Sequence, residues 1–309
     1  MEQNQGVIKK RRIKFETKRT WTGILFLLPC TILVVMFIVI PVINVVRYSF
    51  NETSLADASD MTFVGLDNYK AVPQTEGFNE MIIATIVFAI GVTILTVAVA
   101  FIVAMALDKR GRGYINRGLM RALWFFPALL SAAIVGILWR IMYHYTNGVI
   151  NKTLLQFGAE RVNWLETPWL TNVAVIVAAV WLLMGLCIVI FLAGLQSIPT
   201  ELYEAAKIDG ASKRKIRRHI TIPMMAPAIT INVLTTSIAA FKMYELPWFI
   251  SLGLPGYTTR LLTQRIYFYG FEATNLMGIG AALSVILIIV ITLISLVQLF
   301  VLRKREDIY

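Results

Sequence analysis

The chain has 309 residues, of which 58% are hydrophobic and only 15% are charged, and its formal net charge is +11. Because soluble domains carry about 25% charged residues, this composition excludes an ordinary soluble protein and indicates a membrane protein. Its two cysteines, Cys30 and Cys187, both lie in apolar segments and provide neither a disulfide framework nor a metal motif.

Long apolar runs are the main feature of the chain. A hydrocarbon core about 30 Å thick needs roughly 20 apolar residues per helix, and runs without polar alternation favour helices over a barrel. We therefore predict an all-α polytopic integral membrane protein with six transmembrane helices, at residues 22–46, 81–107, 118–142, 170–194, 224–246 and 278–302. The first contains Pro29 and Pro41, which neighbouring helices can tolerate in a membrane.

Lys and Arg residues gather in alternate flanks of these segments. They are abundant in the basic tail (residues 1–21), in the loop after the second segment, in the loop after the fourth and in the final tail (303–309). The first external loop, residues 47–80, is acidic instead, and it is too short to form its own core. By the positive-inside rule, both termini are expected to be cytoplasmic. The first apolar segment is longer than a signal-peptide core, so we expect it to remain as a transmembrane helix.

Motifs for chemistry are missing from the sequence. It contains no G-x-x-x-x-G-K-[ST], no H-E-x-x-H and no G-x-S-x-G, and its two histidines are isolated. The only candidates for a catalytic cluster inside a predicted span are Lys242 and Glu245, which are three positions apart and could pair on one helix. We therefore expect no catalytic residue, no cofactor and no metal site.

The loop 197–223 is strongly basic and lies between two apolar segments. Its pattern predicts a short helix with Ser197 or Thr200 near its cap, which Gly210 ends in a left-handed conformation. Ser212 is expected to cap a second short helix that carries the basic residues. The loop is thus predicted to form a helix–glycine–helix elbow at the membrane surface.

One face of the first short helix carries small side chains. Leu202, Ala205, Ala206 and Asp209 follow a spacing of three to four residues, so another protein could approach this helix closely. The flanking charges could orient such a partner or bind anionic lipid headgroups. A solvated loop that merely touches lipid is the alternative, and the residues alone leave both open.

The same loop resembles a known signature. Glu204-Ala205-Ala206, Gly210 and Ile220-x-Ile222-Pro223 match the E-A-A-x₃-G-x₉-I-x-L-P pattern of membrane subunits of bacterial binding-protein-dependent ABC importers, with Ile222 where Leu is usual. Further stretches resemble the carbohydrate-type, MalF-like branch: residues 63–69 (FVGLDNY), Phe126-Pro127, Trp139 and residues 148–151 (GVIN). A Gly-Gly-Pro run that is frequent in that branch is replaced here by residues 251–256 (SLGLPG).

This resemblance implies a type I ABC importer transmembrane fold, with its five-helix core at residues 78–300. It also implies a non-catalytic permease subunit, multi-pass in the bacterial cytoplasmic membrane, that imports a sugar, an oligosaccharide or a sugar derivative. Its partners would be a second homologous permease subunit, two ATP-binding cassette ATPase subunits, an extracytoplasmic sugar-binding protein and membrane lipid, but no nucleic acid. The residues that would couple to the ATPase are Glu204, Ala205, Ala206, Asp209, Gly210 and Pro223. Among these, Glu204 would contact the ATPase, the alanines would allow close approach, and Gly210 would provide the bend.

A polar stripe on the fifth predicted span is the candidate substrate pathway. Its members fall within about 120° of arc and are Asn232, Thr235, Thr236, Ala239, Lys242 and Met243. Hydrogen bonding between helices is the alternative role for the hydroxyl and amide groups. Lys242 could bind an anionic sugar group or neutralise Glu245. Trp181 and Met184 on the fourth span could form a sugar-stacking surface or a packing surface.

Two other classes of protein differ from this pattern. A stand-alone secondary transporter of a small polar solute would show inverted repeats and interrupted helices, and it would not need a loop that docks an ATPase. An intramembrane enzyme would need clustered carboxylates or metal ligands inside its spans. No convincing repeat or cluster is evident in the sequence.

Overall fold

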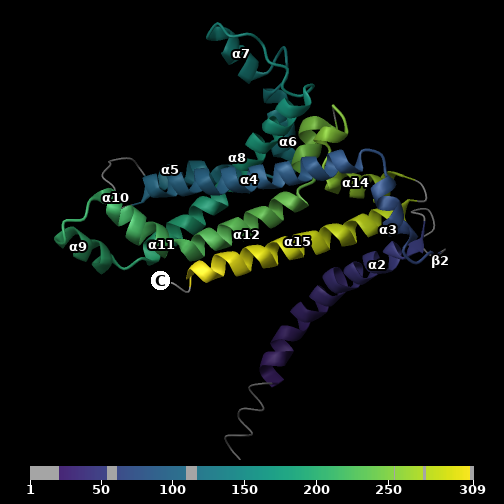
Figure 1. Ribbon diagram of the computed structural model, residues 1–309, viewed down its shortest axis with the longest axis horizontal. Coiled ribbons are helices and arrows are strands. Elements are labelled where there is room, and N and C mark those ends of the chain that lie inside the picture. The colour runs from purple at the N-terminus through teal and green to yellow at the C-terminus, as the bar shows by residue number, and fades with distance from the viewer. Residues whose placement is uncertain (1–20, 54–60, 109–116, 254, 274–275, 307–309) are drawn as a thin grey trace, which may run out of the picture.

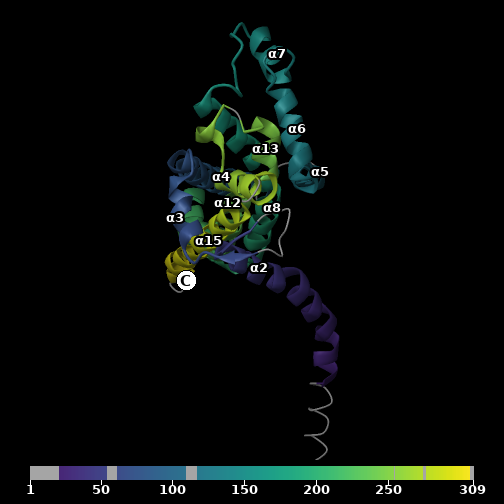
Figure 2. The same ribbon diagram turned by 90° about the vertical axis from the view of Figure 1, so that its right-hand side faces the viewer.

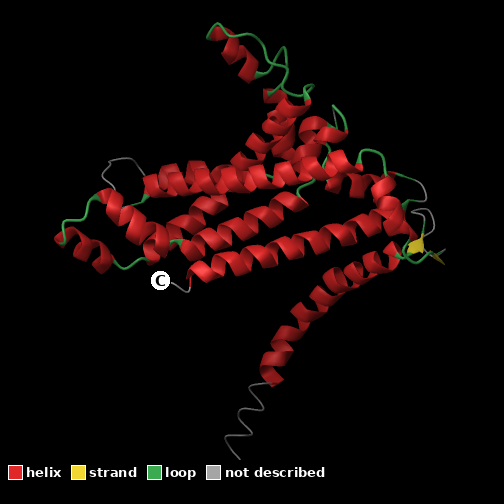
Figure 3. Ribbon diagram, in the orientation of Figure 1, coloured by secondary structure: helices red, strands yellow, loops and turns green. Residues whose placement is uncertain are grey.

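The computed structural model describes residues 21–53, 61–108, 117–253, 255–273 and 276–306. Most of these residues are helical, and four long helices run side by side along the bundle: α4 (Phe78–Leu107), α8 (Pro168–Ser197), α12 (Ala226–Lys242) and α15 (Met277–Glu306) (Figures 1 and 3). The basic residues before position 21, those between 109 and 116, and the last three residues lie outside the described part. Their predicted topology is therefore an expectation only.

Four of the six predicted spans are single continuous helices. Among the described residues, the helices long and apolar enough to cross a membrane are Trp21–Ser49, Phe78–Leu107, Pro168–Ser197 and Met277–Leu302. They correspond to the first, second, fourth and sixth predicted spans. The other two spans are bent pairs of helices, and the total is six if each pair counts as one span.

The third predicted span is not one helix. It consists of α5 (Arg117–Phe125), a 3₁₀ turn η3 (Phe126–Leu129) and α6 (Ala132–Met142), and its two halves are bent by 100°. Pro127 lies in the turn, where it cannot donate a backbone hydrogen bond. Ser131 then starts α6 as an N-cap, with its side chain accepting a hydrogen bond from Ile134 N. The expectation of an uninterrupted helix at 118–142 was wrong because these two residues end one helix and begin another.

The fifth predicted span, 224–246, also differs. Its helix α12 begins at Ala226 after a 59° bend at Met225 and ends at Lys242, and α13 (Glu245–Ser251) follows after a break. The break has a local cause, because the ring of Pro247 would clash with the carbonyl of Met243 in a continuous helix. Lys242 and Glu245 therefore lie on different helices.

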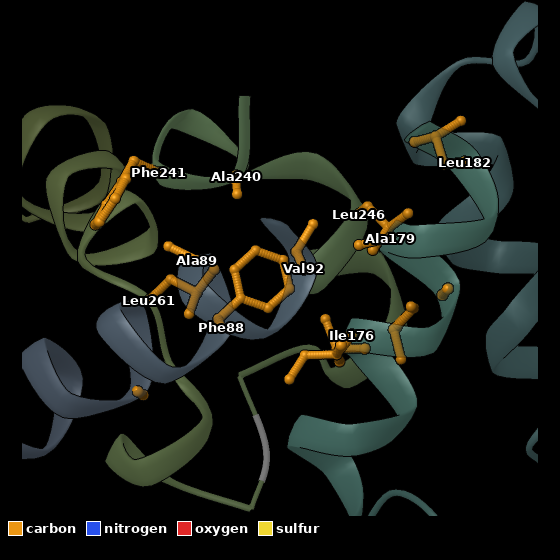
Figure 4. Close-up of a cluster of buried hydrophobic side chains, with 14 of the residues drawn as sticks. Phe88, Ala89, Val92, Ile176, Ala179, Leu182, Ala240, Phe241, Leu246 and Leu261 are labelled. Carbon is orange, nitrogen blue, oxygen red and sulfur yellow. The ribbon is translucent and has the colours of Figure 1, made fainter. Parts of the chain in front are cut away.

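The core lies where α4, α8, α12 and α13 meet. Phe88 and Val92 of α4 pack with Ala179 of α8, Ala240 of α12 and Leu246 of α13 (Figure 4). The first span contributes little to this core, because it curves away from the bundle and only its last part contacts α15 (Figure 2). It contains a π-helical turn, η1 (Val35–Val39), directly before α2 (Ile40–Ser49). The missing N–H of Pro41 is accommodated by this wider turn.

The segment between the first two spans, which was predicted to be an external loop, folds against the ends of α2 and α15. It contains two short antiparallel strands, β1 (Asn51–Glu52) and β2 (Thr62–Phe63), which the all-α prediction did not include, then α3 (Asp67–Ala71) and η2 (Val72–Gln74). Asn68 donates hydrogen bonds to the carbonyls of Ser49 (3.1 Å) and Asn51 (2.9 Å). A Cβ at Gly278 would lie 2.6 Å from the Asn68 amide nitrogen, so glycine permits α15 to begin there.

The remaining elements are short. They are α7 (Val149–Gln156), α9 (Thr200–Ile208), α10 (Lys213–Ile216), η4 (Arg217–Thr221), α11 (Ile222–Met224), η5 (Tyr257–Thr259), α14 (Leu262–Tyr267) and η6 (Phe268–Glu272). Helix α7 extends away from the long bundle at the end of α6 (Figures 1 and 2). Helices α9 and α10 lie at the end of the bundle where α15 finishes, and β2 and α3 lie at the other end (Figure 1).

Asn151 in α7 is expected to hold this protruding segment together. The residue is fully buried, and its amide nitrogen donates to the carbonyls of Tyr145 (3.0 Å) and Val162 (2.9 Å). Its oxygen accepts from Val162 N (3.0 Å) and Trp164 Nε1 (3.1 Å). Asn151→Ala should destabilise the segment by roughly 3 kcal/mol, because buried polar groups lose their partners.

Limited proteolysis of the purified protein at residues 143–167 measures this effect. The matched control is Asn163→Ala, which removes a single exposed hydrogen bond to Glu166. Cleavage should accelerate at least tenfold in Asn151→Ala and less than twofold in the control. Equal cleavage of the two variants would contradict the assignment.

Candidate functional site

The basic loop forms the predicted elbow. Helix α9 ends at Ile208, and Gly210 follows with a φ of +70°, so the left-handed conformation expected from the sequence is confirmed. Gly210 N donates to Lys207 O (3.1 Å) and Ala211 N donates to Ala206 O (2.9 Å). These two bonds make a Schellman motif, which satisfies the last carbonyls of the helix and turns the chain sharply.

Of the two helix caps predicted for the elbow, the structure contains one. Ser212 accepts a hydrogen bond from Lys215 N at 3.4 Å and begins the second helix. The prediction of a cap by Ser197 or Thr200 was wrong, since α9 begins after Pro199 without a side-chain cap. Ser197 is still the last residue of α8, so its hydroxyl donates back to Gly194 O at 2.8 Å.

Pro223 does not begin the fifth span. It lies inside a helical segment, Lys213–Met224, and the bend comes two residues later at the fully buried Met225. The π-helical turn η4 precedes it and accommodates the missing proline N–H. The second half of the elbow therefore leads directly into α12 through one bend.

The two faces of α9 have different surroundings. Tyr203 lies on the inner face, where its hydroxyl is 3.2 Å from Thr221 Oγ1. Ala206 is half-buried, whereas Ala205 and Glu204 are exposed. The predicted stripe of small residues is thus divided between an inner and an outer side.

The exposed side chain of Ile208 was not predicted from the sequence to be part of this surface. Its side chain is 86% exposed at the end of α9, one turn beyond Glu204 and Ala205 on the same face. Its only signal in the sequence was an apolar residue directly before the helix-ending Asp209-Gly210. The basic residues of α10 and η4 that follow are also exposed: Lys213, Arg214, Lys215, Arg217 and Arg218.

The polar stripe of α12 is split by the packing of the helices. Asn232 is fully buried and donates to Cys187 O of α8 at 3.3 Å, and Thr236 Oγ1 lies 3.3 Å from Cys187 Sγ. Both side chains link α12 to α8, as in the interhelical alternative. Thr235, at the other edge of the stripe, is exposed and donates to Ile231 O at 2.8 Å.

The two candidates on α8 have packing contacts. Met184 is buried at 5% exposure. Trp181 lies edge to face with Trp139 of α6, with the ring centroids 5.9 Å apart. Their surroundings correspond to the packing alternative for these two residues.

Lys242 is the last residue of α12, and Met243 follows it directly. Lys242 lines a cavity of about 510 Å³ together with Tyr244, Thr263 and other residues of α14 and α15. Met243 accepts a hydrogen bond from Thr263 Oγ1 at 2.9 Å through its carbonyl. The alternative in which Lys242 pairs with Glu245 is not formed here, since the only ion pair within the described ranges joins Lys70 and Asp67. A larger cavity of about 760 Å³ between α4, α12 and α15 is mostly apolar and therefore suits hydrocarbon better than a polar solute.

Comparison with known proteins identifies the family. Residues 98–306, which include the elbow and α12, match the model of the family described as "Binding-protein-dependent transport system inner membrane component". The chain belongs to this family. It is 31% identical to the trehalose/maltose transport system permease protein MalF of Thermococcus litoralis over 95% of this chain and 98% of that one. It is 34% identical to the arabinooligosaccharides transport system permease protein AraP of Bacillus subtilis over 89% of this chain and 86% of that one.

A solved structure has the same fold. A chain of a bacterial ABC transporter involved in the import of the acidic polysaccharide alginate matches with a TM-score of 0.80 at 22% identity, covering 95% of this chain and 99% of that one. The fold is therefore that of an ABC importer permease, as the sequence resemblance implied. The family is one of inner membrane components, which confirms a multi-pass permease of the cytoplasmic membrane over a stand-alone secondary transporter.

Proposed function

We propose that this permease subunit moves a sugar or oligosaccharide inward and is driven through α9 by separate ATPase subunits. The sugar class is supported by two relatives, which are permease proteins of transport systems for trehalose and maltose and for arabinooligosaccharides. The partners in this proposal are a homologous permease subunit, two ATPase subunits and an extracytoplasmic sugar-binding protein. Both termini lie in the cytoplasm, and ATP is hydrolysed on the ATPase subunits.

The exposed outer face of α9 carries this proposal. Glu204, Ala205 and Ile208 face away from the protein and present a carboxylate, a small side chain and an apolar anchor to an ATPase groove. The inner face is fastened by Tyr203 to Thr221. A force on α9 is therefore transmitted in two directions, through residue 199 to α8 and through the helix that contains Pro223 to α12.

The substrate pathway is proposed to run past the outer end of α12. Lys242 supports this role because it is exposed toward a cavity that also has hydroxyl groups, from Thr263, Ser284 and Thr292. Thr235 and Met243 would border the route. In this proposal Asn232, Thr236, Trp181 and Met184 act mainly by holding α12, α8 and α6 together around it.

Glu204→Lys tests the coupling role. The variant should insert normally into the membrane, since Glu204 is exposed and has no ion-pair partner in the described part of the chain. ATP hydrolysis stimulated by the loaded binding protein should fall at least tenfold in the reconstituted complex, because the ATPase would meet the wrong charge.

The matched control is Glu160→Lys, which reverses an exposed charge in the segment after α7. It should retain at least half of the stimulated ATP hydrolysis. Stimulation that is unchanged in Glu204→Lys would sink the coupling assignment.

A further inference from the structure

A small polar cavity lies between the fifth and sixth spans, apart from the surfaces described above. Its volume is about 170 Å³, and its walls come from α13, α14 and η6 and the segment before α14. The residues that matter for its chemistry are Trp248, Arg260, Gln264, Arg265, Tyr267 and Glu272. Helix α14 lies away from the α9 end of the bundle, so this cavity is on the opposite side from the elbow (Figure 1).

Two buried hydrogen-bond donors in its wall lack partners. Arg265 is only 9% exposed, and its Nε has no hydrogen-bond acceptor among the described residues. Gln264 is 4% exposed, and its Nε2 is likewise without an acceptor there. The orientation of the Gln264 amide is defined, because its oxygen accepts from Leu261 N at 3.2 Å. Since buried donors are normally satisfied, the cavity is suited to a group that carries acceptors.

The Arg265 side chain is held by aromatic rings rather than by an acid. Its guanidinium carbon lies 4.4 Å from the centroid of the Tyr269 ring and 5.3 Å from that of Phe268. Within the described ranges, no carboxylate lies within 4.0 Å of it, although Glu272 lines the same cavity. A buried guanidinium without a counter-ion is unfavourable, so a carboxylate ligand would be strongly attracted.

The neighbouring side chains favour a sugar as the carrier of that carboxylate. Arg260 adds a second cation, positioned by a hydrogen bond from its Nε to Gly253 O at 2.9 Å. Trp248 and Tyr267 line the cavity, and Tyr244 stacks on both, with centroid distances of 6.1 and 4.8 Å. Rigid aromatic faces pack well against the apolar faces of sugar rings, and the arginine fork matches a carboxylate.

We propose that this cavity binds the carboxylate of an acidic sugar, so that the substrate class of this permease includes sugars of the uronic acid type. This proposal rests on the proposed function and narrows the sugar substrate of the permease to acidic sugars. A carboxylate could also come from an acidic side chain of the docked binding protein, and the experiment separates the two sources.

The test uses the purified permease–ATPase complex without its binding protein. D-galacturonate is the probe and D-galactose the matched neutral sugar, and binding is measured by isothermal titration calorimetry. The wild-type complex should bind galacturonate at least tenfold more tightly than galactose. Arg265→Gln should weaken galacturonate binding at least tenfold, and Arg265→Lys should retain part of the affinity. Arg161→Gln, the same change at an exposed arginine, should alter it less than twofold.

Two further variants keep the test decisive if Arg265→Gln does not fold. Gln264→Glu retains an oxygen for Leu261 N but replaces the free donor by a carboxylate, so galacturonate binding should be lost. Glu272→Gln removes the acid that shares the cavity and should tighten binding. Equal affinities for galacturonate and galactose, or unchanged affinity in both Arg265→Gln and Gln264→Glu, would overturn the proposal.

Two further measurements distinguish a carboxylate supplied by the binding protein from one supplied by a sugar, and separate this inference from the proposed function. If galacturonate does not bind but Arg265→Gln weakens docking of the sugar-free binding protein tenfold, the carboxylate belongs to that protein and the sugar assignment is wrong. ATP hydrolysis that depends on Glu204 but not on galacturonate would preserve the proposed function and reject this inference alone.

Discussion

Ile208→Asp should prevent stable assembly of the permease with its ATPase subunits. Ile208 is 86% exposed on the outer face of α9, and burying an isoleucine side chain against a partner contributes about 1.5–3 kcal/mol. An aspartate at this position would lose that contribution and would also bury a charge without a partner. Because about 1.4 kcal/mol corresponds to a factor of ten, the affinity for the ATPase subunit should fall at least a hundredfold.

Copurification of the ATPase subunits with the tagged permease, followed by titration of ATPase into permease-containing membranes, measures this loss. Phe157→Asp is the matched control, since Phe157 is also 86% exposed at the end of a short helix, α7, but far from the elbow. Copurification should be unchanged in the control. Normal ATPase affinity in Ile208→Asp would show that the outer face of α9 is not the docking surface.

Gly210→Val should uncouple ATP hydrolysis from the binding protein. Gly210 has a φ of +70°, and a side chain there costs about 1–2 kcal/mol, more for a β-branched residue. Nothing lies within 4 Å of a Cβ at this position, so the cost comes from the backbone and not from a clash. The chain would relax out of the left-handed conformation, the Schellman motif would open, and the angle between α9 and the second helix would change.

Gly158→Val separates this effect from general destabilisation. Gly158 follows α7, has a φ of +76° and is also free of neighbours within 4 Å, so valine imposes a similar backbone cost there. Both variants should reach the membrane at similar levels. Stimulated ATP hydrolysis should fall at least tenfold in Gly210→Val and stay within twofold of wild type in Gly158→Val. Equal losses in the two variants would assign the effect to stability and contradict a specific role of the elbow.

Local signals in the sequence predicted much of this molecule correctly. Four spans follow from apolar length alone, because a helix that satisfies its own backbone needs no information from its neighbours. The left-handed Gly210 and the Ser212 cap were predicted for the same reason, since the bonds that define them join residues at most five positions apart. The cap predicted for Ser197 or Thr200 failed because α8 continues to Ser197, and the end of a long helix depends on what it packs against.

The bend of the third span and the break between α12 and α13 show an intermediate case. Pro127 and Pro247 were visible in the sequence, but proline can be tolerated within a membrane helix, as Pro29 shows in the first span. Which proline ends a helix depends on whether neighbouring elements can compensate for the lost backbone bond. Around Pro247 the break places Leu246 in the core beside α4 and α8.

The sequence by itself therefore determined the membrane class, the approximate spans and the elbow, because these depend on hydrophobicity, charge and short-range hydrogen bonds. Only the tertiary structure decided which polar side chains are available to a ligand. Asn232 and Thr236 are buried against Cys187 of α8, whereas Lys242 remains exposed to a cavity. Arg265 gave no signal in the sequence, because its burial among aromatic rings depends on how the segment between the last two spans folds back on itself.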